Sequence, residues 1–286
     1  MSKFAISKPA GSPVELSPAE MTEKMVQAIL KNDVAAINAL VVRGADVNAS
    51  DSKGNSMILI AATDPREHRA LEALIAAQAD PNKPSANGRM ALHSVLRMKD
   101  DKLMPAAAET LFKAKADPNM VETRPNNPPQ TAFQVAYEQN RHDRVLEMLL
   151  KNGADPTIGE DMAAKIVAPL HALAWTGRYG VLEAAYQNGV NLDKPASDGM
   201  TCLMLAAREG ATKTVEVLLE CNADPTLVDR RGQDAIAYAH KSPPETDKRA
   251  MLKLLVRAAR DFSLHNEIAK LRHDIDDLRR KVEKPA

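Results

Sequence analysis

Apolar residues recur at intervals of three and four in many short segments of this chain. In Thr214–Glu220 the side chains of Val215, Leu218 and Leu219 share one face of a helix, and Val145–Leu150 shows the same spacing. A helix this short cannot bury its apolar face alone, so neighbouring segments must cover one another. The pattern therefore predicts short helices that stack in repeats.

A short phrase recurs after these helical segments. It reads RGADVN, AQADPN, AKADPN, NGADPT, NGVNLD and CNADPT, and successive copies lie 34, 37, 38, 36 and 33 residues apart. Gly153 and Gly189 in this phrase suit the left-handed backbone at which helices end. A second phrase follows most copies and reads RMALHSV, QTAFQVA, APLHALA and MTCLMLAA. Because the two phrases stay in phase, the chain is predicted to be a repeat array.

These two phrases resemble the ankyrin repeat, with its T-P-L-H-x-A helix start and its G-A-D-x-N exit. The resemblance covers about residues 17–260, and Asp198–Thr226 matches almost throughout. It implies an all-α fold, an ankyrin-repeat solenoid of about six helix-turn-helix repeats with β-turn fingers. In that family the histidine of the first phrase forms structural hydrogen bonds between repeats, which implies this role for His93 and His171.

The array departs from the repeat pattern at three places. Met104 and Pro105 are predicted to lengthen the loop between the helices of the second repeat, and Val121–Gln130 forms a long proline-rich finger. Gly159–Val167 precedes the fourth repeat and is predicted to add a helical turn. Such insertions often lie on the binding face of repeat proteins, and neutral surface variation explains them equally well.

The end of the chain has a heptad pattern that differs from the repeats. Its apolar residues are spaced 4, 3, 4, 3 and 4 apart, and they are Leu264, Ile268, Leu271, Ile275, Leu278 and Val282. Isoleucine and valine fall at heptad position a and leucine at d, a combination that favours parallel two-stranded coiled coils. Glu267 and Asp274 at g can face Arg272 and Arg279 at e of a second chain.

Two interpretations of this tail stay open. It either forms a coiled coil, as a homodimer or with a partner helix, or folds back as a cap over the last repeat, whose apolar face needs cover. The predicted organisation is a flexible arm over residues 1–18, a repeat array over 19–262 and a coiled-coil-like heptad helix over 263–284.

Composition and charge exclude several kinds of partner. Thirty-eight basic residues balance 38 acidic ones, so the chain lacks the positive charge that nucleic-acid binding needs, and we expect no nucleic-acid partner. No apolar run approaches the roughly 20 residues that cross a bilayer, and the N-terminal sequence is not a secretory signal, so we expect no membrane partner.

Cys202 and Cys221 are too few for a disulfide framework and are predicted to be buried. A cytoplasmic location is expected, with secretion into a host cell as the alternative.

The sequence contains no recognisable catalytic or cofactor motif. The seven histidines form no ligand-spaced cluster, and there is no P-loop, dinucleotide fingerprint or nucleophile elbow. We therefore expect no enzyme, no cofactor, no metal and no catalytic residue.

The resemblance implies a protein partner on the concave surface, where the end of each first helix and the finger tips are exposed. Trp175 stands out as the only tryptophan, and large aromatic residues often anchor interfaces. The alternative is that Trp175 packs under Gly159–Val167. Further candidates are Thr63 and Asp64 after one first helix and Ser52 and Lys53 at one finger tip. The predicted partner-binding residues are Trp175, Thr176, Arg178, Tyr179, Arg208, Glu209, Arg97, Met98, Glu138, Gln139, Arg230 and Arg231.

Three functions follow from the sequence, in decreasing order of support. The first is a protein-binding scaffold or inhibitor that uses the concave ankyrin surface. The second is a secreted bacterial effector that binds a host protein. The third is an enzyme whose site is assembled between repeats, for which the sequence offers no candidate residues.

Overall fold

The structure is a computed structural model that describes residues 16–63, 68–100, 102–125, 127–159, 168–243 and 247–282. For residues 276–282 it describes the backbone alone. The chain divides into two compact units, Met1–Ala116 and Asp117–Ala286. Residues 1–15 of the predicted N-terminal arm lie outside the described residues.

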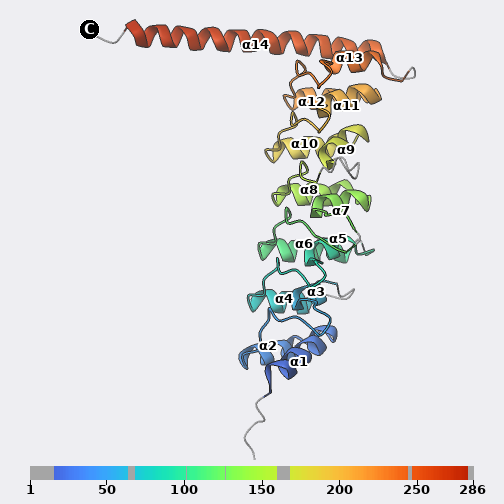
Figure 1. The fold of residues 1–286 in the computed structure, drawn as a ribbon, viewed down its shortest axis with the longest axis vertical. Coiled ribbons are helices and arrows are strands. Elements are labelled where there is room, and N and C mark those ends of the chain that lie inside the picture. Colours follow the sequence, from blue (N-terminus) through green and yellow to red (C-terminus); the bar gives the residue numbers. More distant parts are fainter. Residues whose placement is uncertain are drawn as a thin grey trace, which may run out of the picture. The chain divides into compact units, whose positions relative to one another are not determined.

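The first unit consists of helices that follow one another in pairs. They are α1 (Pro18–Leu30), α2 (Val34–Val42), α3 (Met57–Ala62), α4 (Arg69–Ala76), α5 (Ala91–Leu96) and α6 (Leu103–Lys113). Each pair stacks on the next within this unit (Figure 1). The first helix starts with a capping box, in which the Ser17 hydroxyl accepts a hydrogen bond from the N–H of Glu20 at 3.3 Å and the Glu20 carboxylate accepts one from the N–H of Ser17 at 2.8 Å.

The prediction that Met104 and Pro105 lengthen a loop is wrong. Both residues belong to the first turn of α6, and the Met104 side chain is buried. Proline is tolerated there because the N–H groups of the first turn have no partner within the helix. The loop before α6 therefore ends at Lys102, the N-cap residue.

The second unit repeats the same helix pairs and adds a long last helix. Its helices are α7 (Ala132–Glu138), α8 (Asp143–Lys151), α9 (Pro169–Trp175), α10 (Tyr179–Gln187), α11 (Cys202–Glu209), α12 (Thr212–Glu220), α13 (Ala235–His240) and α14 (Lys248–Val282). Among the described residues of the chain there is no strand, and the fingers contribute the isolated bridges Ser50–Ser56 and Glu122–Gln130. Cys202 and Cys221 are free and buried, as predicted.

A left-handed residue follows each of the second helices α2, α4, α6, α8, α10 and α12. Gly153 and Gly189 have φ values of 84° and 82°, which confirms the prediction from the recurring phrase. Gln78 and Lys115 adopt the same conformation at 64° and 66° although they carry side chains. The turn is therefore a property of the repeat, and glycine merely makes it less costly.

Hydrogen bonds join the turns that follow the second helices of neighbouring repeats, where the G-A-D-x-N exit phrase lies. A side-chain Oδ1 of one exit accepts a bond from the backbone N–H of the next, in the pairs Asn48–Asp80 (2.8 Å), Asn119–Asp155 (2.7 Å) and Asp193–Asp224 (2.9 Å). His171 is buried, and its Nε2 lies 2.9 Å from the carbonyl oxygen of Lys194, which confirms the predicted link between neighbouring repeats. His93 is buried in α5.

Two of the predicted insertions are described in part. The finger Val121–Gln130 closes as a hairpin, because Glu122 and Gln130 exchange backbone hydrogen bonds of 2.8 and 3.1 Å. Of the insertion Gly159–Val167 only Gly159 belongs to the described residues. Its carbonyl oxygen accepts a hydrogen bond of 2.7 Å from Nε2 of Gln134.

The long helix α14 covers the end of the array with its first half. Met251 and Leu255 are fully buried, and the helix packs against α12 and α13. The helix runs on without a break through residue 262, where the sequence predicted a domain boundary. Its second half projects beyond α12 and α13 (Figure 1).

Candidate functional site

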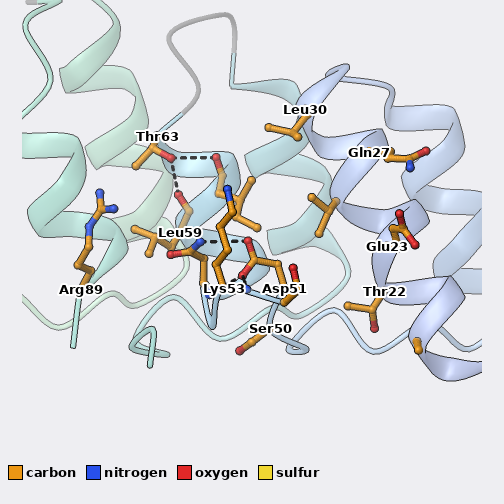
Figure 2. Close-up of a pocket in the computed structure, with 15 residues that line it drawn as sticks. Thr22, Glu23, Gln27, Leu30, Ser50, Asp51, Lys53, Leu59, Thr63 and Arg89 are labelled. Atoms are coloured by element: carbon orange, nitrogen blue, oxygen red, sulfur yellow. Dashed lines mark hydrogen bonds between the residues drawn. The ribbon is translucent and has the colours of Figure 1, made fainter. Parts of the chain in front are cut away.

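A groove of about 1190 Å³ runs across the first unit, between α1 and the finger that precedes α3. Figure 2 shows the finger residues Asp51 and Lys53 between Glu23 and Gln27 of α1 on one side and Leu59 of α3 on the other. The groove is lined by Ala19, Thr22, Glu23, Val26, Gln27, Leu30, Ser50, Asp51, Ser52, Lys53, Asn55, Leu59, Ile60, Thr63 and Arg89.

The α1 wall of the groove is the outer face of an amphipathic helix. Met25 and Ile29 point into the core and are fully buried. Residues Ala19, Val26 and Leu30 lie on the groove side at helical spacing, and Leu30 remains 55% exposed. This face therefore offers apolar surface to a partner as well as the carboxylate of Glu23.

The finger wall is shaped by hydrogen bonds to the Asp51 carboxylate. One carboxylate oxygen of Asp51 accepts hydrogen bonds from the N–H groups of Lys53 (2.9 Å) and Asn55 (2.8 Å), and the other accepts one from the Asn55 amide at 3.0 Å. Burial raises the pKa of this carboxyl, but the hydrogen bonds from Asn55 and Lys53 outweigh it, so the pKa is lowered. Asp51 therefore stays ionised and shapes the finger.

Two cations lie on the finger side of the groove. Lys53 is exposed at the tip of the first finger, and Arg89 lines the groove from the second finger. Thr63 ends α3 by donating a hydrogen bond of 2.9 Å to the carbonyl oxygen of Leu59. Asp64, which the sequence proposed beside Thr63, lies outside the described residues. The groove thus combines apolar surface on α1 with a finger side that carries the cations Lys53 and Arg89 beside the ionised Asp51.

In the second unit, the structure brings three of the predicted partner-binding residues together. Trp175 at the end of α9 is 51% exposed, and the guanidinium carbon of Arg208 lies 5.9 Å from the centroid of its ring. Arg208 also forms an ion pair of 3.0 Å with Glu209. We call Trp175, Arg208 and Glu209 the tryptophan patch.

Other predicted residues near Trp175 have partners within the protein. Nε of Arg178 donates a hydrogen bond of 2.8 Å to Asp143, and Nη2 donates one of 2.8 Å to the carbonyl oxygen of Arg141. The Thr176 hydroxyl donates one of 2.8 Å to the carbonyl oxygen of Ala172. Tyr179 remains 43% exposed.

The remaining predicted residues are spread over both units. Arg97 and Met98 are half-buried at the end of α5 in the first unit. Glu138 and Gln139 are located at the end of α7 in the second unit, and Glu138 accepts a hydrogen bond from the amide of Gln130. Arg230 and Arg231 are exposed at the last finger.

Sequence reasoning named only part of the groove. It proposed the finger tip at Ser52 and Lys53 and the helix end at Thr63, but it gave no role to the wall formed by α1. The available signal was Val26 and Leu30, two apolar residues at the edge of the core face of the helix. Scattered surface apolar residues are common in proteins, so this signal is weak without a structure.

Among the residues that the structure describes, no group of three or more His, Cys, Asp or Glu side chains is placed to hold a metal ion. Over the same part of the chain, no helix has the length and hydropathy needed to cross a membrane.

Comparisons with known proteins agree with the repeat phrases. Residues 170–266 match the family model for ankyrin repeats (3 copies). Neurogenic locus notch homolog protein 1 of Danio rerio is 34% identical over 111 residues, which cover 38% of this chain and 4% of that protein. Protein glp-1 of Caenorhabditis elegans is 29% identical over 209 residues, which cover 70% of this chain and 15% of that protein. The chain therefore matches a small part of the length of these relatives.

Solved structures show the same fold. The ankyrin repeat domain of Bcl-3, a member of the IkappaB protein family, superposes with a TM-score of 0.57 at 18% identity and covers 82% of this chain and 97% of that one. The ankyrin repeat domain of human ASB11 gives a TM-score of 0.51 at 18% identity over 81% of this chain and 96% of that one. The predicted fold class, an all-α ankyrin-repeat solenoid, is confirmed, and a long final helix occupies the region for which the sequence predicted a coiled-coil-like helix.

Proposed function

We propose that this protein binds another protein through the groove between α1 and the first finger. Ankyrin repeats are in general modules for binding between proteins, which supports this class of function. The observation that carries the proposal is the groove itself, which exposes Leu30 on a helix whose core face is already complete. Exposed apolar surface rimmed by polar residues is typical of a protein-binding site.

The walls of the groove indicate the chemistry of the partner. Val26, Leu30 and Ile60 offer apolar contacts, while Lys53 and Arg89 line the finger side. A partner segment with apolar side chains on one face and a carboxylate on the other satisfies both walls, because apolar burial supplies affinity and charge pairing fixes orientation. We therefore expect a short amphipathic segment with at least one acidic residue.

The tryptophan patch is a second candidate surface. A half-exposed tryptophan with an arginine against its ring is a common anchor of protein interfaces. Each surface is therefore tested by its own substitution.

The experiment is an affinity capture from source-cell lysate with the full chain as bait. Leu30→Asp places a charge in the groove, and we expect it to lose the captured protein. Val42→Asp is the matched control, because Val42 ends α2 of the same helix pair and is 87% exposed. Both substitutions add one carboxylate at the C-terminal end of a helix, so they act on the helix dipole in the same way.

The outcomes separate the two surfaces. Capture that survives Leu30→Asp and is lost with Trp175→Ala assigns binding to the tryptophan patch and overturns the groove. Capture that survives both changes overturns both surfaces. If the chain is a secreted effector, the same variants give the same pattern with host-cell lysate in place of source-cell lysate.

A further inference from the structure

The two halves of α14 differ in what covers them. Met251 and Leu255 in the first half are fully buried against the end of the array. Between residues 263 and 275 every side chain is exposed. The cap over the last repeat is therefore formed by the first half of the helix, and the second half continues past it.

Four large apolar side chains form a stripe along this exposed half. Leu264 is 56% exposed, Ile268 41%, Leu271 57% and Ile275 51%. Their spacing of 4, 3 and 4 places them on one face of a helix as heptad positions d, a, d and a. We call these four residues the seam. Because the helix is continuous, the seam cannot turn back onto the last repeat without breaking α14.

We propose that the seam binds the seam of a second copy of this chain, forming a parallel two-stranded coiled coil. Isoleucine at a and leucine at d are the residues that favour this geometry. Burying the stripe removes apolar surface from water, which is the driving force for association. This inference is independent of the proposed groove, which lies in the other unit.

Charges beside the seam fit a second copy in parallel orientation. Glu267 and Asp274 occupy g positions, and Arg272 occupies the e position between them. In a parallel pair, g of one helix faces e five residues later in the other, so Glu267 faces Arg272 of the second copy. The sequence places Arg279 at the e position that Asp274 faces. An antiparallel pair would instead bring e positions together and oppose arginines.

The coil begins at Leu264. One heptad earlier, positions d and a are Arg257 and Asp261, whose side chains form an ion pair of 3.7 Å within the same helix. Charged residues at both positions do not support an apolar seam, so the paired region is short. A short coil associates weakly, and we expect the dimer to dissociate on dilution.

The test is the molar mass of the full chain, measured by sedimentation equilibrium over a range of concentrations. We expect twice the chain mass of 31.1 kDa at high concentration and the single mass on dilution. Leu271→Asp should stay at the single mass throughout. Its matched control is Ala269→Asp, at the exposed b position outside the seam, which should still dimerise. Both variants should fold, because positions 269 and 271 are exposed in the monomer.

Charge exchange tests the parallel orientation. Glu267→Arg should weaken the dimer by opposing Arg272 of the second copy, and adding Arg272→Glu should restore it. A wild-type chain with the single mass at every concentration overturns the proposal. So does a dimer that Leu271→Asp leaves intact, because another surface then holds it. A monomer that captures a foreign helix through the seam also overturns it.

Discussion

Arg178 and Arg208 in the second unit have the same relation to an aromatic ring but different surroundings. The guanidinium carbon lies 5.9 Å from the ring centroid in both, over Tyr137 for Arg178 and over Trp175 for Arg208. The Arg178 side chain is 17% exposed and bonds to Asp143, which belongs to the preceding repeat. The Arg208 side chain is 36% exposed and pairs with the adjacent residue in the chain.

The difference teaches that residue type does not identify an interface residue in a repeat array. The sequence proposed both arginines as partner contacts. Arg178 precedes the second helix of its repeat, where the preceding repeat supplies Asp143 and a carbonyl oxygen. Arg208 ends a first helix, where its ring partner is itself half-exposed. The position within the repeat therefore separates a structural arginine from a candidate binding one.

The largest expected effect comes from breaking the structural arginine. Arg178→Ala removes an ion pair, a hydrogen bond to a backbone carbonyl and a contact with an aromatic ring. We expect the free energy of unfolding to fall by about 2 kcal/mol, a value reduced from that of a fully buried pair because Asp143 is 45% exposed. Urea denaturation followed by circular dichroism measures the change.

Two variants sharpen this result. Arg178→Lys keeps the charge but cannot form both bonds in the same plane, so its stability should fall between wild type and Arg178→Ala. Arg208→Ala should change the stability by less than about 0.5 kcal/mol. Equal losses from the two alanine variants would contradict the comparison.

A smaller effect on the free energy of unfolding is expected at Asp193. Its half-buried carboxylate faces the carboxylate of Asp224, whereas the carboxylate of Asp143 faces an arginine. Asp193 occupies the place that Asn48 and Asn119 hold in other exits. Burial raises its pKa, the hydrogen bond from the N–H of Asp224 lowers it, and the Asp224 carboxylate raises it again, so the pKa is raised overall. The ionised form therefore costs stability in the folded protein.

Asp193→Asn should raise the free energy of unfolding by about 1 kcal/mol at neutral pH. The raised pKa gives wild type a stabilising contribution that is complete below the unfolded pKa of 3.8 and is lost as the pH rises through the folded value. The advantage of the variant should therefore shrink on acidification to about pH 4. Urea midpoints at both pH values measure it.

The reverse exchange, from asparagine to aspartate at the same position of another repeat, is the control for Asp193→Asn. Oδ1 of Asn119 accepts the N–H of Asp155 at 2.7 Å, and its amide donates a bond of 2.8 Å to the carbonyl oxygen of Gly153. Asn119→Asp loses that donor and should be less stable than wild type. If both exchanges shift the midpoint in the same direction, the account of the exit position is wrong.

Much of the fold could be predicted from the sequence because the repeat phrases recur in both units of the array. The exit phrase and the helix-start phrase fix where helices begin and end, and the left-handed Gly153 and Gly189 follow from them. The error at Pro105 has a local cause. Proline was taken as a loop residue, although the first turn of a helix accepts it at no cost in hydrogen bonds.

The candidate site could be predicted only in outline. Exposure of Trp175 follows from its place after the core residue Ala174, but the pairing of Arg178 with Asp143 depends on how two repeats stack. The groove depends on the space between α1 and a finger, which no single phrase encodes. Burial within a repeat is periodic and can be predicted from spacing, whereas contacts such as Arg178–Asp143 depend on how closely neighbouring repeats stack, which residue spacing does not show.

A small effect on stability, and the sharpest test of the contact between Arg208 and the Trp175 ring, is expected from Trp175→Ala. The ring is 51% exposed, so its removal should change the free energy of unfolding by less than about 1 kcal/mol and leave the helical content intact. A cooperative loss of several degrees in Tm, which is typical of substitutions in a protein core, would instead show that the ring packs as core. Arg208 would then be structural like Arg178. Thermal unfolding followed by circular dichroism decides between the two, and the capture experiment on the same variant shows whether an intact fold has lost a partner.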